Sequence, residues 1–244
     1  MSAPLLELRD LSFAYGDKPV IQSVSLAMDG GRIGLIGPNG GGKTTLLHLA
    51  MGLLSPDSGD VLLDGEPVRG KDGLRELRRQ VGFVFQNPDD QLFCPTVLED
   101  VAFGPLNMGM KPRQARDTAA EALERLGLAG FEDRVTHRLS GGEKRLVSLA
   151  TVLAMSPRGL LLDEPTNDLD PDTRDRLIAI LRSLEQSMLI VSHDWDFLNQ
   201  ATSRLYALDK GRLTRQDRIV LHRHAHAHPG GAAEHLHVDP GAAP

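Results

Sequence analysis

The sequence lacks the features of an exported or membrane-spanning chain. It contains a single cysteine, Cys94, which cannot form an intramolecular disulfide and fits a reducing cytosol. We interpret Cys94 as a small loop or core residue. The longest apolar stretch, around 46–54, is interrupted by His48 and Gly52 and is far shorter than the ~20 residues that a membrane span needs. No charged segment followed by an apolar one comes after Met1, so we do not expect export.

An excess of basic residues is also absent. The 27 lysines and arginines are outnumbered by 33 aspartates and glutamates, which gives a formal net charge of −6. This charge argues against general affinity for nucleic acid, which usually requires a basic surface, but it leaves room for a local basic patch. A hydrophobic content of 41% and a charged content of 25% are ordinary for a globular protein. A length of 244 residues accommodates one α/β domain with a subdomain.

What the sequence does contain is a complete phosphate-binding loop at 37–45. It fits the pattern G-x-x-x-x-G-K-[ST] with Gly37, Pro38, Asn39, Gly40, Gly41, Gly42, Lys43, Thr44 and Thr45. Glycines allow backbone N–H groups to point into one concavity and keep side chains away from a phosphate chain. We expect Lys43 to reach the β- and γ-phosphates and the Thr44 hydroxyl to take a place on Mg²⁺. The loop therefore predicts binding of a Mg-nucleotide.

The segments around the loop provide the structural context that this motif requires. A short buried strand is expected at 32–36, and a helix at 43–51 whose N-terminus adds partial positive charge near the phosphates. Continuous apolar segments at 81–85, 160–162 and 188–191 are typical of buried parallel strands. Alternating apolar residues at 6–8 and 20–28, and a turn between 61–63 and 68, predict antiparallel strands.

Helical patterns occupy much of the remaining sequence. We expect a short helix at 73–79, at most a short helix at 97–102 in the loop-rich stretch 87–110, and longer helices after Pro112, near Ser140 and after Pro171. The predicted fold class is α/β, a P-loop NTPase core with a mainly parallel sheet, an N-terminal antiparallel β subdomain and a helical subdomain inserted at about 87–156. In such sheets, ligands bind beyond the carboxyl ends of the strands.

Polar residues stand at the carboxyl ends of three expected strands. Asp163 follows three leucines and is placed to hold Mg²⁺ directly or through water, which is the Walker-B role. Glu164 is then the candidate to orient or deprotonate the attacking water, because a carboxylate committed to a metal is a poor base. His193 is a candidate to contact the γ-phosphate, and Gln86 to complete the metal shell or the water network. Without the phosphate loop, an Asp-Glu pair is more often a solvated turn.

An aromatic residue lies upstream of the phosphate loop, in a turn that we expect at 13–17. Tyr15 can stack on a purine ring, but a lone tyrosine at a strand end is as often a packing residue. The residues themselves leave both interpretations open.

The segment 139–145, Leu-Ser-Gly-Gly-Glu-Lys-Arg, resembles the signature of ABC-type ATPases. The resemblance covers about residues 4–215 and implies that Tyr15 is the adenine-stacking A-loop residue, Gln86 the Q-loop glutamine, 167–170 the D-loop and His193 the switch histidine. It also implies that Ser140, Gly141 and Gly142 bind the γ-phosphate of ATP held by an opposite subunit. One chain would then carry two half-sites, and ATP would join two chains until hydrolysis releases them. Gly41 and 167–168 depart from the commoner residues of the family.

The segments 86–93 and 97–105 resemble the ATPases of energy-coupling-factor importers, especially the cobalt and nickel group. The resemblance implies that this region receives a helix of an integral membrane subunit. It further implies a peripheral location at the cytoplasmic face of the cell membrane and a second ATPase subunit, identical or different.

The chain ends in a histidine-rich segment, which divides it into an ATPase domain at 1–216 and a flexible tail at 217–244. Six of the nine histidines lie there, namely His222, His224, His226, His228, His235 and His237. The first four share one face if the backbone is extended, whereas a helix would pair 222 with 226 and 224 with 228. Neutral imidazoles suit nickel, cobalt, copper or zinc. Pro229, Gly230 and Gly231 suggest mobility. The alternative is a merely polar tail or an expression tag, although the irregular spacing argues against a tag.

Together these features predict the ATP-binding, ATP-hydrolysing subunit of a membrane importer for a divalent transition metal, cobalt or nickel. ATP and Mg²⁺ are the expected cofactors, the partners are a second ATPase subunit and membrane subunits, and nucleic acid is not expected. One alternative is an ABC ATPase for another cargo such as a vitamin. Another is a metal-binding chaperone or storage module acting through the histidine tail. DNA-repair ATPases share the signature but usually insert long coiled coils, and the sequence has no heptad run.

Overall fold

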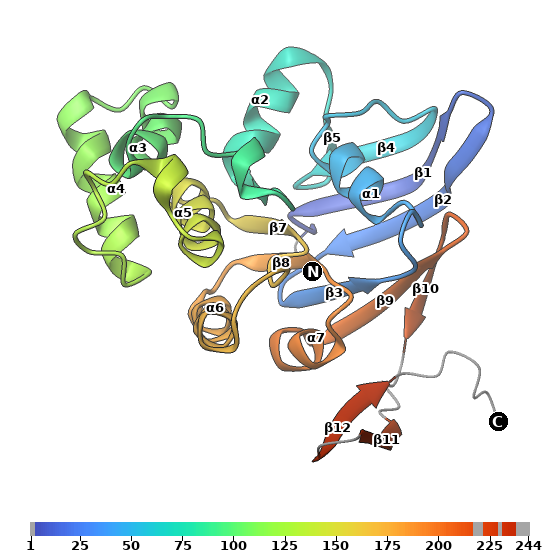
Figure 1. Cartoon of the computed structure of the whole chain (residues 1–244). Helices are drawn as coiled ribbons and strands as arrows, with labels where there is room; N and C mark the ends of the chain where they lie inside the picture. Colours follow the sequence, from blue (N-terminus) through green and yellow to red (C-terminus); the bar gives the residue numbers. More distant parts are fainter. Residues whose placement is uncertain (1–2, 217–221, 229–230, 238–244) are drawn as a thin grey trace.

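The computed structural model describes residues 3–216, and the backbone of 222–228 and 231–237. Figure 1 shows two β-sheets, one above the other, with helices around them. Pro229 and Gly230, on which the expectation of a mobile segment rests, lie outside the described residues. No helix within the described ranges is long and apolar enough to pass through a bilayer.

The larger sheet is mainly parallel, as predicted. Its order is β10-β9-β3-β8-β7-β6, in which only β10 runs antiparallel to its neighbour. The strands are β3 (Arg32–Ile36), β6 (Val81–Val84), β7 (Gly159–Asp163), β8 (Ser187–Val191), β9 (Arg204–Asp209) and β10 (Arg212–Gln216). Every residue of β6, β7 and β8 is buried, which explains their continuous apolar sequences. The carboxyl ends of β3, β6, β7 and β8 lead into the predicted site residues.

The smaller sheet is antiparallel, with the order β2-β1-β4-β5. Its strands are β1 (Leu6–Tyr15), β2 (Lys18–Met28), β4 (Ser58–Leu63) and β5 (Glu66–Pro67). The predicted turn between β4 and β5 falls at Asp64 and Gly65, both with positive φ. The prediction of a turn at 13–17 is wrong for residues 13–15. These residues continue β1, because they pair with β2 as far as Tyr15, which lies opposite Lys18.

Between β6 and β7 the chain is helical. It forms η1 (Pro88–Asp90), α3 (Val97–Asn107), α4 (Pro112–Arg125), η2 (Thr136–Arg138) and α5 (Gly141–Leu153). The expectation of at most a short helix at 97–102 is wrong, because α3 continues through Pro105 to Asn107. A capping box at Thr96 and Glu99 starts α3, and packing against α4 and α5 offsets the one backbone hydrogen bond that Pro105 cannot make.

The remaining helices are α1 (Lys43–Ala50), α2 (Gly70–Gln80), α6 (Pro171–Ser183) and α7 (Trp195–Ala201). Helix α2 begins earlier than the 73–79 expected, and α7, β9 and β10 were not predicted.

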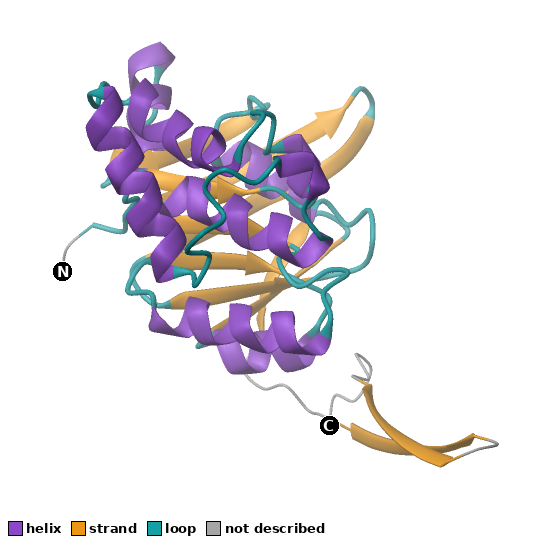
Figure 2. Ribbon diagram, turned by 60° about the vertical axis from the view of Figure 1, so that its left-hand side comes forward, coloured by secondary structure: helices purple, strands orange, loops and turns teal. Residues whose placement is uncertain are grey.

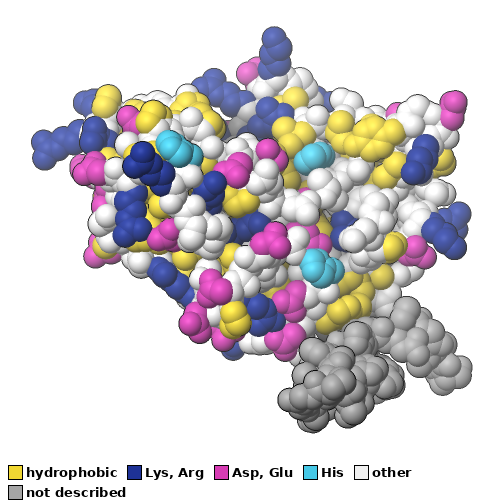
Figure 3. Space-filling model, in the orientation of Figure 1, with side chains coloured by type: hydrophobic (Ala, Val, Ile, Leu, Met, Phe, Trp, Pro, Cys, Tyr) yellow, Lys and Arg dark blue, Asp and Glu magenta, His cyan; other side chains and the backbone are white. Residues whose placement is uncertain are grey.

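In Figure 2 the helices stand in front of the strands and cover that face of the larger sheet. On the face in Figure 3 acidic and basic side chains are intermixed.

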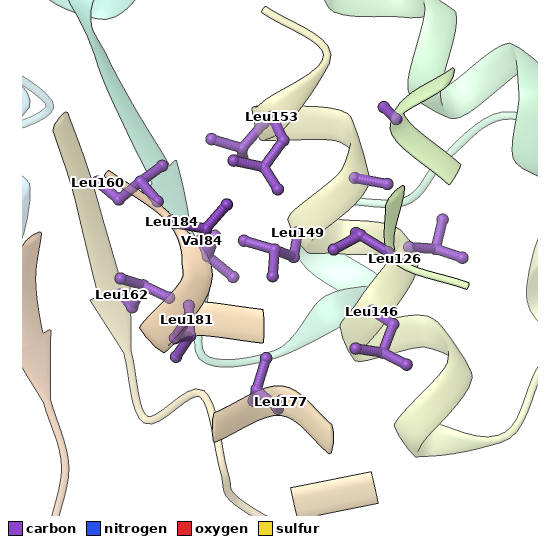
Figure 4. Close-up of a cluster of buried hydrophobic side chains, with 14 of the residues drawn as sticks. Val84, Leu126, Leu146, Leu149, Leu153, Leu160, Leu162, Leu177, Leu181 and Leu184 are labelled. Carbon is purple, nitrogen blue, oxygen red and sulfur yellow. The ribbon is translucent and has the colours of Figure 1, made fainter. Parts of the chain in front are cut away.

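Two hydrophobic cores hold these layers together. One lies between the two sheets and contains Leu46, Leu47 and Leu49 of α1 packed with residues of β1, β2 and β3. The other joins α5 to the larger sheet and α6. Figure 4 shows Leu146, Leu149 and Leu153 of α5 in this cluster with Leu160, Leu162, Leu177, Leu181 and Val84. This packing fixes the start of α5 relative to β7.

The histidine-rich segment forms two further strands, β11 (His222–His228) and β12 (Gly231–His237), paired as an antiparallel ladder. Of the two backbone conformations considered for it, the extended one is therefore present.

Candidate nucleotide-binding site

The phosphate loop connects the buried end of β3 to the first residue of α1. Gly42 is the N-cap of α1 with φ 95°, a left-handed conformation that favours glycine. At Gly37 a Cβ atom would lie 2.2 Å from the backbone oxygen of Leu208 on β9. A side chain at either position is therefore excluded, and the loop can approach a phosphate through its backbone alone.

Lys43 lies across the loop and is only 7% exposed. Its Nζ donates hydrogen bonds to the carbonyl oxygens of Gly37 at 2.8 Å and Pro38 at 3.0 Å. The ammonium group is thus held over the concavity by neutral acceptors. Because phosphate oxygens are charged, they are stronger acceptors for the same group.

Thr44 and Asp163 form the corner expected to hold magnesium. The Thr44 hydroxyl donates to Asp163 Oδ2 at 2.7 Å, and Asp163 is 1% exposed. Its Oδ1 is buried and finds no hydrogen-bond partner in the part of the chain that the structure describes. Burial raises the pKa of the Asp163 carboxyl, the Thr44 hydrogen bond lowers it, and the charge of Glu164 raises it further. A hydroxyl beside an unpaired carboxylate oxygen suits a hard cation such as Mg²⁺, so these residues fit the metal.

Glu164 is buried next to Asp163 and bonded to His193. Its backbone has φ 46°, and its N–H donates to Val191 O at 2.9 Å, which turns the chain at the end of β7. Glu164 Oε2 lies 2.9 Å from His193 Nδ1 and accepts the His193 backbone N–H at 3.2 Å. The Glu164 side chain is 8% exposed and that of His193 is 63% exposed. The histidine therefore orients a buried carboxylate while its own ring faces solvent.

A cavity of about 730 Å³ lies over the loop. Predicted residues that line it are Tyr15, Asn39, Gly40, Gly41, Gly42, Lys43, Thr44, Thr45, Gln86, Asp163 and Glu164. Sequence reasoning missed Lys18, Gln22 and Lys210, which also line it. Backbone and side chain of Gln22 bond to Gly211 and Lys210, 188 residues or more along the chain, and no local pattern signals such a contact. Tyr15 is 54% exposed and packs edge to face on Phe13 at 4.8 Å, so it remains free to stack.

The family model described as ABC transporter matches residues 21–167. The chain belongs to the ABC transporter family. It is 54% identical to an ABC transporter ATP-binding protein of Nitratidesulfovibrio vulgaris, over 98% of this chain and 88% of the relative. That alignment extends into the histidine-rich segment. The chain is 47% identical to the energy-coupling factor transporter ATP-binding protein EcfA of Methanothermobacter thermautotrophicus, over 86% of this chain and 69% of the relative.

Among solved structures, CbiO1 of Clostridium perfringens, described as part of the ABC transporter complex CbiONQ, superimposes with a TM-score of 0.78. It is 33% identical, and the match covers 87% of each chain. The resemblance to ABC ATPases of the energy-coupling-factor type is therefore confirmed. As an ABC ATPase the protein is an ATP hydrolase whose cofactors are ATP and Mg²⁺.

The ABC signature lies at the start of α5, away from the phosphate loop. Ser140 is the N-cap, and its hydroxyl accepts the Glu143 N–H at 3.2 Å while Glu143 Oε2 accepts the Ser140 N–H at 2.8 Å. Ser140 and Gly141 are exposed, and Ser140, Gly141 and Gly142 do not line the cavity over the loop. A helix N-terminus with a serine provides hydrogen-bond donors for an anion, but here it lies outside the cavity over the chain's own phosphate loop.

Other predicted residues fall outside this site. The ring of His193 does not line the cavity, although its partner Glu164 does. The side chains of His222, His224, His226 and His228 lie outside the described residues. Among the side chains that the structure does describe, no group of three or more histidine, cysteine or acidic residues is arranged to hold a metal ion.

Proposed function

We propose that this ABC ATPase is the ATP-hydrolysing subunit of a membrane importer for a divalent transition metal, cobalt or nickel. It would be a peripheral subunit at the cytoplasmic face of the membrane and act by ATP-dependent closure of a dimer. The observation that carries the chemistry is the pair of adjacent buried carboxylates. Asp163 is bonded to Thr44 of the loop and Glu164 to His193. The names of the relatives EcfA and CbiO1 support an importer of the energy-coupling-factor type.

The residues divide the work of phosphoryl transfer. The backbone of 37–42 and Lys43 bind the β- and γ-phosphates, and Tyr15 stacks on the adenine. Thr44, Asp163 and Gln86 would hold Mg²⁺, which neutralises charge on the phosphate oxygens when bound. Glu164 accepts a proton from the attacking water, and His193 holds its carboxylate in place. Because Glu164 is only 6% exposed, its carboxylate is poorly solvated, which favours its action as the base.

The second half of each catalytic site comes from a partner chain. Ser140, Gly141 and Gly142 provide N–H and hydroxyl donors that face outward, and ATP on one chain would bind them on the other. A γ-phosphate bound between two chains joins them, and its loss on hydrolysis releases them. The partner is a second ATPase subunit, identical or different.

The membrane partner would bind at a second cavity, of about 790 Å³, between α2, α3 and the end of α5. Phe93 and Phe103 line it, are 65% and 44% exposed, and pack edge to face at 4.8 Å. Exposed aromatic pairs of this kind mark surfaces for protein contact. Part of its lining, including Phe93 and Phe103, belongs to the segment 86–105 that resembles energy-coupling-factor ATPases, so we assign the cavity to a helix of the membrane subunit.

Two other functions fit parts of the chain. The same machinery can drive import of another cargo such as a vitamin, because the nucleotide site carries no information about cargo. A metal-binding chaperone or storage module would act through the histidine-rich segment alone. Purification of the transporter from membranes with metal analysis separates these: cobalt or nickel in a complex with membrane subunits supports the importer, whereas recovery of the chain without membrane subunits contradicts it.

The ATPase mechanism is tested with Glu164→Gln, which keeps the size and loses the base. We expect ATP binding to be retained, turnover to fall at least about 100-fold, and a dimer to persist with ATP in size-exclusion chromatography. Glu121→Gln is the control, since it makes the same change at an exposed position of α4. Turnover in Glu164→Gln equal to the wild type would remove Glu164 from this role.

A further inference from the structure

An ion-pair cluster between α6 and α7 lies outside the nucleotide cavity. The two helices lie side by side in Figure 1. Arg174 stands in the first turn of α6, four residues after Asp170, which caps that helix. Its guanidinium reaches Asp194, the N-cap of α7, and Asp196 in the first turn of α7. None of these residues lines the cavity over the phosphate loop, so direct contact with a nucleotide does not explain the cluster.

The contact between Arg174 and Asp194 is bidentate. Arg174 Nε donates to Asp194 Oδ2 at 2.8 Å, and Nη2 donates to Oδ1 at 3.2 Å. The planar guanidinium matches a carboxylate in this geometry, which the single ammonium group of lysine cannot reproduce. The two side chains are 21% and 26% exposed, so solvent screens this pair less than a surface pair.

The charged form of Asp194 is the one that the fold stabilises. Burial alone would raise the pKa of the Asp194 carboxyl, but hydrogen bonds from Arg174 and from the Phe197 N–H hold this pKa below its ordinary value. Nη2 of Arg174 also donates to Asp196 Oδ2 at 2.8 Å. One guanidinium therefore fixes both the cap and the first turn of α7.

The residue before Asp194 is His193, which bonds to the proposed base. Its Nδ1 lies 2.9 Å from Glu164 Oε2, and its backbone N–H donates to the same oxygen at 3.2 Å. The backbone is held on both sides of this histidine, since Ser192 is fully buried and Asp194 is bonded to Arg174. The His193 side chain is 63% exposed, so little packing fixes its ring. Its position therefore depends on these two backbone anchors.

We propose that Arg174 is a positioning residue for ATP hydrolysis, which holds the backbone after β8 so that His193 stays on the carboxylate of Glu164. The proposal rests on the proposed roles of Glu164 and His193. Arg174 lies outside the cavity and acts through His193 alone, so it should affect the chemical step and not the binding of ATP.

The first test is steady-state ATP turnover of the full chain with Arg174→Met, which removes the guanidinium and keeps much of the side-chain volume. We expect kcat to fall at least about tenfold, because Glu164 loses the group that orients it. KM for ATP should change less than about twofold, because the phosphate loop is untouched. Arg174→Lys, which keeps the charge without the bidentate contact, should recover only part of kcat.

Arg176→Met is the matched control on the same helix. Arg176 Nη2 donates to the carbonyl oxygens of Leu126 and Gly127, at the end of α4 and away from His193. This variant also loses two hydrogen bonds of α6, but its kcat should stay within about twofold of the wild type. An equal loss of kcat in Arg174→Met and Arg176→Met would show a general effect on α6 and overturn the proposal.

The second test reads the position of His193 without nucleotide. In the ¹⁵N NMR spectrum of the histidine-labelled full chain at pH 8, where free imidazole is neutral, the His193 signal is the one missing from His193→Gln. We expect the Nδ1 signal to move in Arg174→Met towards that of a free imidazole and to stay in place in Arg176→Met. An unchanged His193 signal, or an unchanged kcat, in Arg174→Met overturns the proposal. Wild-type turnover in Glu164→Gln would instead contradict the proposed function, while the NMR spectrum still shows whether Arg174 holds the ring.

Discussion

The residue with the greatest conflict between stability and function is Asp163. Its carboxylate is almost completely buried, one oxygen is bonded to Thr44, and the other has no partner among the described residues. Burial raises the pKa of its carboxyl, so the folded protein holds a proton there more tightly than the unfolded chain does. In the metal-free protein the free energy of unfolding therefore falls as the pH rises through the unfolded pKa towards the raised folded one.

Removing this charge should stabilise the nucleotide-free protein. We expect Asp163→Asn to raise the free energy of unfolding at pH 7.5 by on the order of 1 kcal/mol, measured by urea denaturation. Mg²⁺ with ATP should raise the denaturation midpoint of the wild type but much less that of the variant, because the metal loses its carboxylate. Asp60→Asn, at an exposed ion pair with Arg69, is the control. A variant less stable than the wild type would show that the buried charge is already compensated.

Among the elements, α5 has two separate connections. Its first residues carry the outward-facing signature, while its later turns contact residues on both sides of Gln86. Arg145 is 4% exposed and donates from Nη1 to the Phe85 carbonyl at 2.8 Å. Gln91 donates from Nε2 to Ser148 O at 2.8 Å and to Thr151 Oγ1 at 2.7 Å. A shift of α5 on contact with a partner's ATP would therefore move the residue before Gln86.

Arg145 should contribute far more than a surface arginine. Burial lowers the pKa of its guanidinium, and the charges of Asp168, Asp163 and Glu164 raise it. Its removal takes a positive charge from near these carboxylates and leaves the Phe85 carbonyl without its hydrogen bond. We expect Arg145→Met to lower the free energy of unfolding by about 2 kcal/mol. Arg158→Met, which breaks the half-exposed pair with Asp64, should cost less than about 1 kcal/mol. Chemical denaturation of both measures the difference, and equal losses would contradict a structural role for Arg145.

The elements also show which parts of the fold can be predicted from the sequence. Turn glycines, continuous apolar strands and the motifs at their ends are local signals. They predicted β3, β6, β7 and β8 correctly, and they singled out 39–45, Asp163 and Glu164, which line one cavity. Helix α3 was underestimated because a proline signal is local whereas the packing that overrides it is not. Lys210 enters the site through a contact between distant segments, because Gln22 of β2 donates a hydrogen bond to the Lys210 carbonyl between β9 and β10. Such a contact is set by the assembled fold and not by the local sequence.

For the whole molecule, the proposed function means that one chain alone has an incomplete site. Its phosphate loop and carboxylates line one cavity, and the residues 140–142 that would complete it lie elsewhere and face outward. Gly141 offers a way to block this face without disturbing the chain, because a Cβ atom there would meet nothing within 4 Å. At Gly142, by contrast, it would lie 2.9 Å from Thr173.

Mixing two inactive variants should restore activity if each site is shared between chains. Lys43→Ala removes the phosphate lysine, and Gly141→Asp places a negative charge where the partner's γ-phosphate would bind. Neither should hydrolyse ATP alone. In a randomly mixed population half of the dimers carry one intact site, made from the unaltered loop of one chain and the unaltered signature of the other. ATP turnover should therefore return to about a quarter of the wild-type value. An unchanged urea midpoint for Gly141→Asp is the control for folding. Absence of any recovery, with both variants folded, would indicate that each chain completes its own site or that the natural partner is a different subunit, and repeating the assay with the wild-type chain as the partner decides between these.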